Sequence, residues 1–587
     1  MRSDRIIESR GEDMSLSESK PWLKFYDYVP VSIDYPKISM YECVRRTADQ
    51  YPDEIAYDFM GTCRTYKNFI ADIEQFAKAL YAIGLRKGDT ITISMPTSPQ
   101  GVIAFYAANK IGVIASMIHP LSTQSEIEFY VTKSKSRMVL TIDIFYDKLI
   151  AVQNKTGFEK LIIAKIPDYL PALLSVLYWL KQGRKNPKVT NTDKVILMST
   201  MMKTNYPEHP QLDVKTEELA VILYSGGTTG KPKGIMLSNY NFIAEGQMVA
   251  QWGGIDRRYP KMLAVLPIFH GFGLGVCINA VLMAGGRCIM VPIFEPNNVA
   301  KLIKKKEPHY LIGPPTLYAA LNKNENFRKA NLDCFKAAFS GADTLPKKVK
   351  QEFENIVKAR GGKVKLLEGY GLTEAVTAIM AMPLNEYREN SIGVPFPDMR
   401  AKIVKKGTIE ESAPGEEGEI CVEGPAVMMG YLDEPEETAK TIKKHADGRS
   451  WLHTGDIGYM DQDGFFYFKL REKRMIKSSG MNVYPAQVED QLYTHPAVSE
   501  VCVIGVPDIQ QVEKVKAFVV LKDPSKACPE MEKELINHAQ KDLIKWSCPR
   551  EVEFVNELPK TLVGKIAFKV LEEEEIKKLK AAGKFSG

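Results

Sequence analysis

The amino-acid sequence predicts an α/β protein. We expect a large N-terminal domain of mainly parallel sheets covered by helices, plus a small β-subdomain, followed by a small, mobile α+β C-terminal domain. The chain has 587 residues, enough for several domains with large buried cores. Helix-like and strand-like segments alternate over most of it, and antiparallel-strand patterns replace that alternation near residue 400.

The first 200 residues show the alternation most clearly. Apolar residues recur at helical spacing in some segments and form short continuous runs in others. The helix candidates are 71–84, 99–109 and 125–133, and the strand candidates are 90–95 and 111–117. This βαβα order predicts mainly parallel strands with helices packed on both faces.

The same alternation continues from residue 218 to about residue 400. A helix candidate lies at 296–306, and the strand candidates are 218–223, 235–237, 262–266, 309–313, 337–340 and 364–367. Most of these strands end in a short polar or glycine-rich turn. Open α/β sheets usually place their functional sites at such turns.

Later segments predict the smaller units. Three antiparallel strand candidates, at 400–405, 418–422 and 465–469, indicate the β-subdomain. Beyond them the pattern predicts strands at 501–506 and 516–521 and helices at 530–545 and 571–582. We therefore divide the chain into a poorly ordered leader (1–35), the large domain (36–470) and the C-terminal domain (471–587), joined by a short hinge.

Composition excludes several classes of protein. A net charge of +6 is small for this length, and the sequence contains no basic stripe interleaved with aromatic residues. Neither feature therefore indicates nucleic-acid binding. The nine cysteines contain no Cys-x-x-Cys pair, and the eight histidines show no metal-ligand spacing. This pattern predicts reduced thiols in a cytosol rather than a disulfide frame or a zinc site. The charged N-terminus has no apolar core and is not a secretory signal.

Two apolar stretches raise the question of a membrane. Residues 269–286 follow a histidine motif, and we interpret them as a buried segment lining a site. Residues 169–180 are too short to span a bilayer and are followed by Lys181, Arg184, Lys185 and Lys188. A packed helix with a solvated end is the favoured interpretation. Peripheral contact of 169–188 with the inner face of an anionic membrane is the alternative.

The string LYSGGTTGKPKG, at 223–234, joins two strand candidates. Glycines let backbone N–H groups face an anion, and hydroxyls and a lysine add donors and charge. Pro232 follows Gly230 and Lys231, where the common nucleotide loop of kinases needs Ser or Thr and then a helix. The pattern therefore predicts a hairpin that holds a polyphosphate. A flexible surface turn is the alternative.

Further strings carry groups suited to a nucleotide and a metal. His270 lies in PIFHGFG, and Tyr370 in EGYGLTE could stack on a heterocycle. Thr373 and Glu374 offer the oxygen ligands that Mg²⁺ prefers beside phosphates. Asp456 in WLHTGD suits ribose hydroxyls, and PKTLVGK supplies Lys565. Taken alone, each string has an ordinary structural explanation.

Together, and in this order, the strings resemble those of the adenylate-forming superfamily, which includes acyl-CoA synthetases, luciferases and peptide-synthetase adenylation domains. The likeness spans roughly residues 40 to 572 and also includes SGAD and REKRMIKSSGMNVYP. It implies a mobile C-terminal domain with the active site between the domains. The resemblance supports an enzyme over a non-catalytic lipid or nucleotide sensor.

The resemblance also implies site residues. Those around the carboxylate and the reacting phosphate are Lys565, Glu374 and His270, with Glu374 and Thr228 as Mg²⁺ ligands. The implied ATP- or AMP-binding residues are Ser225, Gly226, Gly227, Thr228, Thr229, Gly230, Lys231, Gly341, Ala342, Glu368, Gly369, Tyr370, Gly371, Thr373, Asp456 and Arg471. Ser478, Ser479 and Gly480 would form the coenzyme A loop, and Lys473 would be the hinge.

The implied reaction is ATP-dependent activation of a carboxylic acid to acyl-adenylate and pyrophosphate, followed by transfer to coenzyme A. A medium- or long-chain fatty acid is favoured, because EGYGLTE lacks the tryptophan pair of acetate-activating relatives and the glycines after His270 would leave room for a long tail. Loading of a carrier-protein pantetheine, an aryl acid and luciferase-like oxygenation are alternatives. A homodimer is compatible with the family. Arg474, Leu470 and Ser479 depart from the family pattern.

Overall fold

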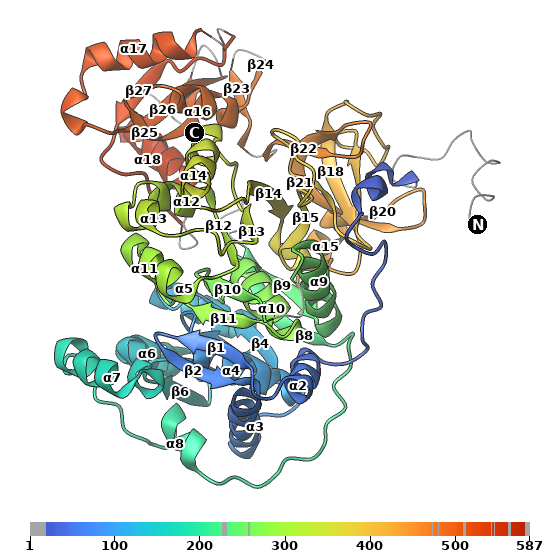
Figure 1. Cartoon of the computed structure of the whole chain (residues 1–587), viewed down its shortest axis with the longest axis vertical. Helices are drawn as coiled ribbons and strands as arrows, with labels where there is room; N and C mark the ends of the chain where they lie inside the picture. Colours follow the sequence, from blue (N-terminus) through green and yellow to red (C-terminus); the bar gives the residue numbers. More distant parts are fainter. Residues whose placement is uncertain are drawn as a thin grey trace.

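The structure is a computed structural model that describes residues 19–225, 232–255, 259–471, 474–478, 481–508, 512–541, 543–544, 546–561 and 565–581. Two large sheets and their helices form the lower body in Figure 1. The small β-subdomain and the C-terminal domain lie side by side above them. The predicted α/β architecture is therefore confirmed.

The first large sheet has the strand order β16-β15-β14-β13-β12-β10-β11-β1-β2. Its strands are β1 (Ile55–Phe59), β2 (Thr62–Thr65), β10 (Lys261–Ala264), β11 (Arg287–Met290), β12 (Tyr310–Gly313), β13 (Ala337–Ser340), β14 (Leu366–Gly371), β15 (Ala378–Ala381) and β16 (Val394–Pro395). The central strands from β1 to β14 are parallel. The carboxyl ends of β12, β13 and β14 consequently share one edge, where the sequence placed its motifs.

The second large sheet has the order β19-β9-β8-β4-β3-β5-β6-β7. Its strands are β3 (Thr90–Ser94), β4 (Ile114–Met117), β5 (Met138–Ile142), β6 (Lys160–Ala164), β7 (Val195–Leu197), β8 (Leu219–Ser225), β9 (Lys233–Ser238) and β19 (Gly430–Tyr431). Strands β8 and β9 are antiparallel, and Ser225 pairs with Lys233. The predicted hairpin around the glycine-rich string is therefore confirmed, although 226–231 lie outside the described residues.

Helices cover both sheets. They are α2 (Met40–Gln50), α3 (Tyr66–Ala82), α4 (Pro99–Lys110), α5 (Gln124–Lys133), α6 (Tyr146–Thr156), α8 (Met198–Lys203), α9 (Asn239–Trp252), α10 (Ala280–Met283), α11 (Pro296–Lys306), α12 (Pro315–Asn322), α13 (Glu325–Lys329) and α14 (Lys347–Ala359). Helix α9 contacts β8 and β9 of one sheet and β15 of the other. Its first turn is capped by the Ser238 hydroxyl, which accepts the N–H of Asn241. Because both sheets press on α9, most of its residues are buried.

The β-subdomain is an antiparallel sheet of β17 (Arg400–Val404), β18 (Gly418–Glu423), β20 (Ile442–Lys444), β21 (Ser450–Met460) and β22 (Phe466–Arg471), flanked by α15 (Pro435–Thr441). The C-terminal sheet contains β23 (Ile476–Ser478), β24 (Met481–Val483), β25 (Val498–Asp508), β26 (Val512–Leu521) and β27 (Glu551–Phe554). Helices α16 (Pro485–Tyr493), α17 (Pro529–Ala539) and α18 (Phe568–Ala581) pack against this sheet. It has its own hydrophobic core.

Several predicted boundaries are wrong. Strand β14 runs on to Gly371, because residues beyond Glu368 pair with β15. Most of EGYGLTE is therefore strand rather than turn. The string WLHTGD lies inside the long strand β21. Helix α17 ends at Ala539, six residues before the predicted end.

Part of the predicted leader is ordered. A short helical turn, η1 (Pro21–Phe25), buries Trp22 against the ring of Phe466. The Tyr26 hydroxyl donates to the Pro395 carbonyl at 2.5 Å, and the Tyr26 ring lies on Trp252 at the end of α9. The prediction of a poorly ordered leader is therefore wrong from residue 19 onward.

The two apolar stretches differ in outcome. Residues 269–286 form the π-helix η5 (Phe272–Asn279) and α10, both buried, as expected. Residues 169–183 form η3 (Ile166–Tyr169), α7 (Ala172–Tyr178) and η4 (Trp179–Gly183), with α7 at the outer edge of the body in Figure 1. Helix α7 and η4 bury none of their residues, so the packed-helix interpretation is wrong. Among the described residues, no helix combines the length and apolarity needed to cross a bilayer.

Candidate active site

A cavity of about 1110 Å³ lies where the large domain, the β-subdomain and the C-terminal domain meet. Its walls come from the ends of β8, β13 and β14, from β21 and β22, and from residues 560–561 and 565–570 of the C-terminal domain. Segments far apart in the sequence therefore converge on one site. The cavity exceeds the usual size of a pocket for a single small molecule.

Asp456 is a deeply buried acidic residue beside this cavity. The Tyr370 hydroxyl donates to Asp456 Oδ2 at 2.7 Å, and Arg471 Nε lies 3.1 Å from Oδ1. Asp456 is 1% exposed, and burial raises its pKa although the Arg471 charge opposes that rise. Near Asp456, the cavity is lined by its sequence neighbours Gly455 and Ile457 and by its partners Tyr370 and Arg471. Asp456 itself lies just behind them.

The predicted adenine-side residues lie on the cavity wall with one exception. Those that line it are Gly341, Ala342, Gly369, Tyr370, Gly371 and Thr373. A side chain at Gly371 would collide with the Thr377 carbonyl, so glycine lets β14 and β15 pack closely there. Glu368 does not line the cavity. Its carboxylate accepts the Tyr387 hydroxyl at 3.0 Å and lies 3.9 Å from Lys350 Nζ, so the side chain points away from the cavity and the nucleotide contact of Glu368 stays a prediction.

Glu374 lines the cavity from the short turn η6 (Thr373–Ala375). The Tyr431 hydroxyl donates to Glu374 Oε1 at 3.0 Å and so orients the carboxylate. Val376, two residues after Glu374, has a φ of +61°, which is strained for a β-branched residue. The cavity is lined by lysine and arginine side chains, which favour phosphate groups. A carboxylate held in place beside them suits a metal ion that also binds phosphate oxygens.

His270 lines the cavity from the turn that follows β10. Its Nδ1 accepts the backbone N–H of Phe272 at 3.1 Å, which leaves the proton of the neutral ring on Nε2. Burial, with the nearby Lys565 charge, lowers the pKa of His270 to about 3. The imidazole is therefore a neutral hydrogen-bond donor at physiological pH.

Lys565 reaches the same cavity from the C-terminal domain. The Thr561 hydroxyl accepts the backbone N–H of Lys565 at 3.1 Å, which shapes the turn that carries it. Burial and then the Arg471 charge lower the pKa of Lys565, and the carboxylates of Asp343 and Asp456 oppose that shift. A lysine with a depressed pKa gains the most from an arriving anion.

Other predicted residues have different outcomes. Ser225, the last residue of β8, lines the cavity. Ser478 is fully buried in β23 and does not line it. Gly226, Gly227, Thr228, Thr229, Gly230 and Lys231 lie outside the described residues, as do Lys473, Ser479 and Gly480.

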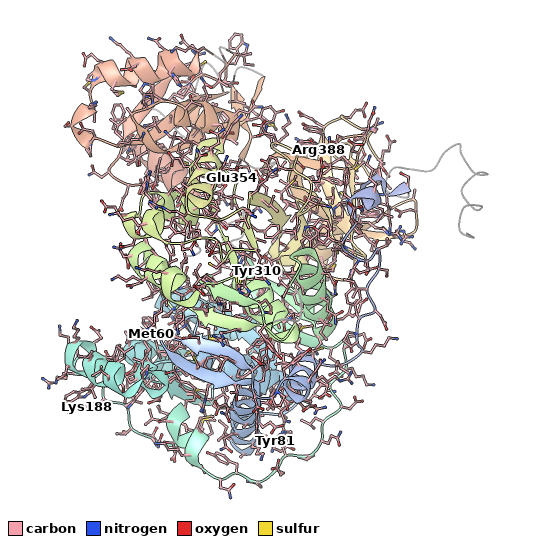
Figure 2. The ribbon with its side chains drawn as sticks, viewed as in Figure 1. Met60, Tyr81, Lys188, Tyr310, Glu354 and Arg388 are labelled. Carbon is pink, nitrogen blue, oxygen red and sulfur yellow. The ribbon has the colours of Figure 1, made fainter. Side chains whose placement is uncertain are left out.

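The sequence did not single out the apolar part of the cavity. Its walls include Val249, Trp252, Ile255, Val276, Tyr310, Ile312, Phe339, Met380 and Phe396. Trp252 Nε1 donates to the Met382 carbonyl at 3.1 Å, and the Tyr310 hydroxyl donates to the Gly254 carbonyl at 2.8 Å. Figure 2 labels Tyr310 in the middle of the large domain. Because backbone carbonyls satisfy both polar groups, these rings can offer apolar faces to a ligand.

The glycines after His270 were predicted to make room for a long tail, and this prediction is wrong. A side chain at Gly271 or Gly273 would collide with the carbonyl of Val376 or Pro267, and one at Gly275 would crowd the Glu245 carboxyl at 2.8 Å. These glycines let η5 pack closely against its neighbours. The apolar extension instead runs between α9 and β12.

Two further residues line the cavity, and only His119 could have been found from the sequence. His119 lies in the turn after β4, where the rule for strand ends applies, and its ring contacts Phe269. Arg474, noted as a departure from the family pattern, lines the cavity and pairs with Glu489 at 2.5 Å. The position of Arg474 on the cavity wall depends on how the C-terminal domain packs against the large domain, and the sequence does not show that packing.

The depressed pKa of His270 predicts how stability depends on pH. The folded state holds this ring neutral, with a pKa of about 3, whereas the unfolded chain takes up a proton below the ordinary value of 6.5. Its contribution to stability is therefore complete above 6.5 and is lost as pH falls toward 3. His270→Asn should flatten the fall in Tm measured from pH about 7 to about 4.5.

The control is His209→Asn, because the His209 ring is only half-buried and does not line the cavity. It should leave the wild-type dependence of Tm on pH unchanged. An equal fall in wild type and in His270→Asn would contradict a neutral, buried His270.

Comparison with known proteins gives a consistent result. The sequence models for the AMP-binding enzyme and for the AMP-binding enzyme C-terminal domain match residues 44–432 and 487–565. The chain is 37% identical to a long-chain-fatty-acid–CoA ligase of Bacillus subtilis over 95% of this chain and 99% of that protein. It is 34% identical to one of Salmonella typhimurium over 94% and 98%.

A solved structure agrees with this. ATP-bound MatB from Rhodopseudomonas palustris matches with a TM-score of 0.78 and 26% identity, over 92% of this chain and 99% of that one. The match covers all the domains that form the cavity. This chain belongs to the AMP-binding enzyme family.

Proposed function

We propose that the protein is an AMP-forming acyl-CoA synthetase for medium- or long-chain fatty acids. It would join the acid to AMP with release of pyrophosphate, and then transfer the acyl group to coenzyme A with release of AMP. The observation that carries this is one cavity with two parts, a polar end lined by cations and an apolar extension between α9 and β12. The similarity to long-chain-fatty-acid–CoA ligases supports the choice of acid.

The first step must bring two anions together. A carboxylate oxygen attacks the α-phosphorus of ATP, and the bond to the pyrophosphate oxygen breaks. The cavity supplies positive charge for this from Arg471 and Lys565, with Lys233 and Lys443 also on its wall. Fixed cations in a water-poor site stabilise the developing charge without reorganising. The approach of Lys565 to Asp456 places that ammonium beside the proposed ribose site.

We assign Mg²⁺ to Glu374, with Thr228 as the second proposed ligand. The Glu374 carboxylate lines the cavity with one oxygen held by Tyr431, which fits an ion that takes few protein ligands and several phosphate oxygens. When bound, the ion would neutralise part of the triphosphate charge. Tyr370 and Asp456 would hold the adenosine, and His270 would donate a hydrogen bond from its Nε2–H to the substrate carboxylate.

The second step needs a thiol in place of the departed pyrophosphate. The thiol sulfur attacks the acyl carbonyl carbon and AMP leaves with the electron pair of the broken bond. Ser478, in β23, is buried away from the cavity here. We infer that the C-terminal domain turns about the hinge at Lys473, withdraws Lys565 and brings the loop at 478–480 to the site.

Lys565→Ala tests the proposed division of labour between the steps. It should lower ATP–pyrophosphate exchange on the order of 100-fold or more, because a fixed cation at the reacting phosphate is lost. Thioester formation from supplied acyl-adenylate and coenzyme A should stay near the wild-type rate. Lys533→Ala, an exposed lysine of α17, is the matched control and should affect neither step. Equal losses in both steps would contradict the assigned role.

Val249→Trp tests the path of the acyl tail. Val249 is buried on the cavity side of α9, and a larger ring there would block the extension. Activity on acids of about sixteen carbons should fall at least about tenfold relative to acids of about six carbons. Gln251→Trp, at an exposed position of the same helix, should leave the preference unchanged. A general loss at every chain length would refute this path.

We further propose that α7 and η4 rest on an anionic membrane surface. Leu173, Val176 and Trp179 are 72%, 56% and 53% exposed, and Leu177 and Leu180 are also exposed. Lys181, Arg184, Lys185 and Lys188 follow at once and are all exposed, with Lys188 at the outer edge in Figure 2. Apolar side chains beside clustered cations are the composition of an interfacial anchor. Such contact would bring the enzyme to its insoluble substrate.

Co-sedimentation with phosphatidylglycerol-rich vesicles tests this contact. The double variant Leu173→Ser, Trp179→Ser should bind at least about tenfold more weakly, because two large apolar groups no longer enter the bilayer. Ile293→Ser removes an isolated side chain that is 76% exposed and should bind as wild type does. Equal sedimentation of all three proteins would contradict the contact. Self-association as a homodimer stays a separate prediction.

A further inference from the structure

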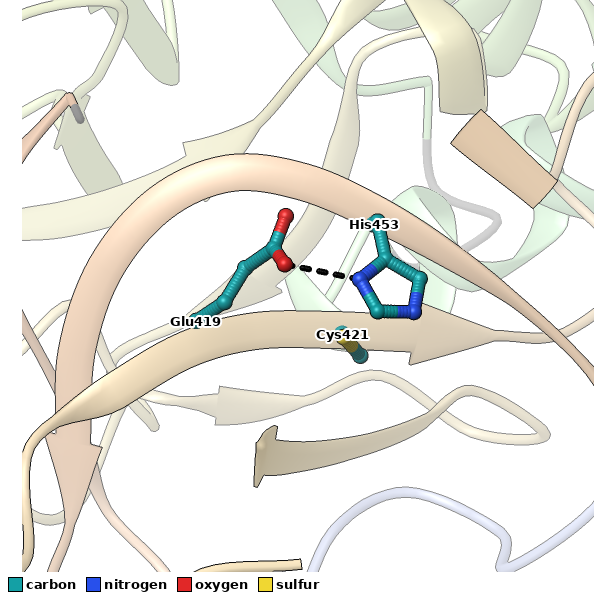
Figure 3. Close-up of side chains that lie close together, drawn as sticks. All are labelled: Glu419, Cys421 and His453. Carbon is teal, nitrogen blue, oxygen red and sulfur yellow. Dashed lines mark hydrogen bonds and ion pairs between the residues drawn. The ribbon is translucent and has the colours of Figure 1, made fainter. Parts of the chain in front are cut away.

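The β-subdomain contains a cluster of metal-binding side chain types that the sequence analysis did not anticipate. Glu419 and Cys421 lie on β18, and His453 lies on β21 (Figure 3). Cys421 and His453 are opposite each other in the antiparallel pair. One ligand atom from each of the three residues lies within 4.8 Å of the other two. Strand pairing therefore brings together residues whose spacing in the sequence carried no metal signal.

The cluster is buried and includes a second histidine. Cys421 is 0% exposed, His453 7% and His445 5%. His453 Nδ1 lies 2.7 Å from Glu419 Oε2, and His453 Nε2 lies 2.9 Å from His445 Nε2. Four side chains with sulfur, nitrogen and oxygen donors thus share one small region of the protein interior.

The hydrogen bonds of the cluster leave one lone pair unused. If His453 donates Nδ1–H to Glu419, its Nε2 carries a lone pair and accepts the Nε2–H of His445. His445 Nδ1 is then an acceptor, and it is buried with no hydrogen-bond partner. Buried polar atoms without partners are uncommon, and one reason for them is a missing ion.

We propose that Glu419, Cys421 and His453 form a site for a thiophilic divalent cation such as Zn²⁺, with His445 as the neighbour that hydrogen-bonds to His453. Cys–His–carboxylate sets suit Zn²⁺ and its neighbours in the transition series. The ion would bind the Cys421 thiolate, and the thiol proton would leave to solvent. The site is separate from the one proposed for Mg²⁺, which takes oxygen ligands.

The location of the cluster links it to the nucleotide cavity. Glu419 Oε1 accepts the backbone N–H of Gly455 at 2.9 Å, and Gly455 precedes Asp456. Glu419, His453 and Gly455 also line the cavity. An ion bound to a Glu419 oxygen would alter the hydrogen bond between Glu419 and Gly455, which holds the strand segment that carries Asp456. Occupancy of this site would therefore alter the affinity for adenosine ligands, a consequence that rests on the proposed function.

Titration of the full chain with Co²⁺, followed by Zn²⁺ competition, tests the site itself. We expect one ion per chain, a near-ultraviolet thiolate-to-Co²⁺ charge-transfer band, and release of about one proton per ion. Cys421→Ser should abolish the band and weaken Zn²⁺ binding on the order of 100-fold. Cys548→Ser, at a buried thiol that donates to the Leu543 and Ile544 carbonyls, is the matched control and should retain both.

Further measurements cover the case in which Cys421→Ser fails to fold. His445→Gln keeps a hydrogen-bonding side chain and should weaken Zn²⁺ binding about 10- to 100-fold with the band retained. The ¹¹³Cd resonance of the wild-type protein should show the downfield shift of a sulfur-ligated ion. A wild-type protein without the band, or a band that survives Cys421→Ser, would overturn the site. None of these readouts depends on enzyme activity, so a failure here leaves the proposed function standing.

Discussion

The arrangement of the site depends on Asp456, a carboxylate that is buried away from water, where a charge is energetically costly. Tyr370 and Arg471 satisfy it from within the large domain and the β-subdomain, and the Lys565 charge reaches it from the C-terminal domain. A buried carboxylate without such partners would take up a proton. The same interactions therefore oppose the rise in the pKa of Asp456 that burial causes, and they connect the three domains around one cavity.

That cavity separates charge from apolar surface. Its polar end carries lysines and arginines that favour a triphosphate, while His270 is neutral and offers a hydrogen bond without adding charge. Its other end is lined by Trp252, Tyr310 and their apolar neighbours. The ordered N-terminal segment supports this wall, because Tyr26 and Tyr28 pack on Trp252. A molecule with an anionic head and an apolar tail matches both ends.

The sequence predicted what local pattern determines, and it failed where tertiary contacts decide. Alternating apolar periodicity located β3, α4, α11 and β13 almost to the residue, and the glycine-rich string correctly predicted a hairpin. The sequence did not show that the Glu368 carboxylate lies away from the cavity, because its partners Lys350 and Tyr387 are not local in sequence.

Other failures have the same origin. The glycines after His270 proved to accommodate backbone contacts rather than substrate. The pairing of Cys421 with His453 depends on strand register, and the exposure of α7 depends on what packs beside it. Neither can be calculated from one segment. The motifs located many of the residues that line the polar end of the cavity, but they did not locate most of its apolar walls.

The most direct test of convergence on one cavity is a crystal structure with a non-hydrolysable analogue of a long-chain acyl-adenylate. Our account predicts ribose hydroxyls within hydrogen-bond distance of Asp456, the Lys565 ammonium beside the acyl phosphate, and the tail between α9 and β12. An analogue bound with its ribose away from Asp456, or with its tail directed to solvent, would contradict it.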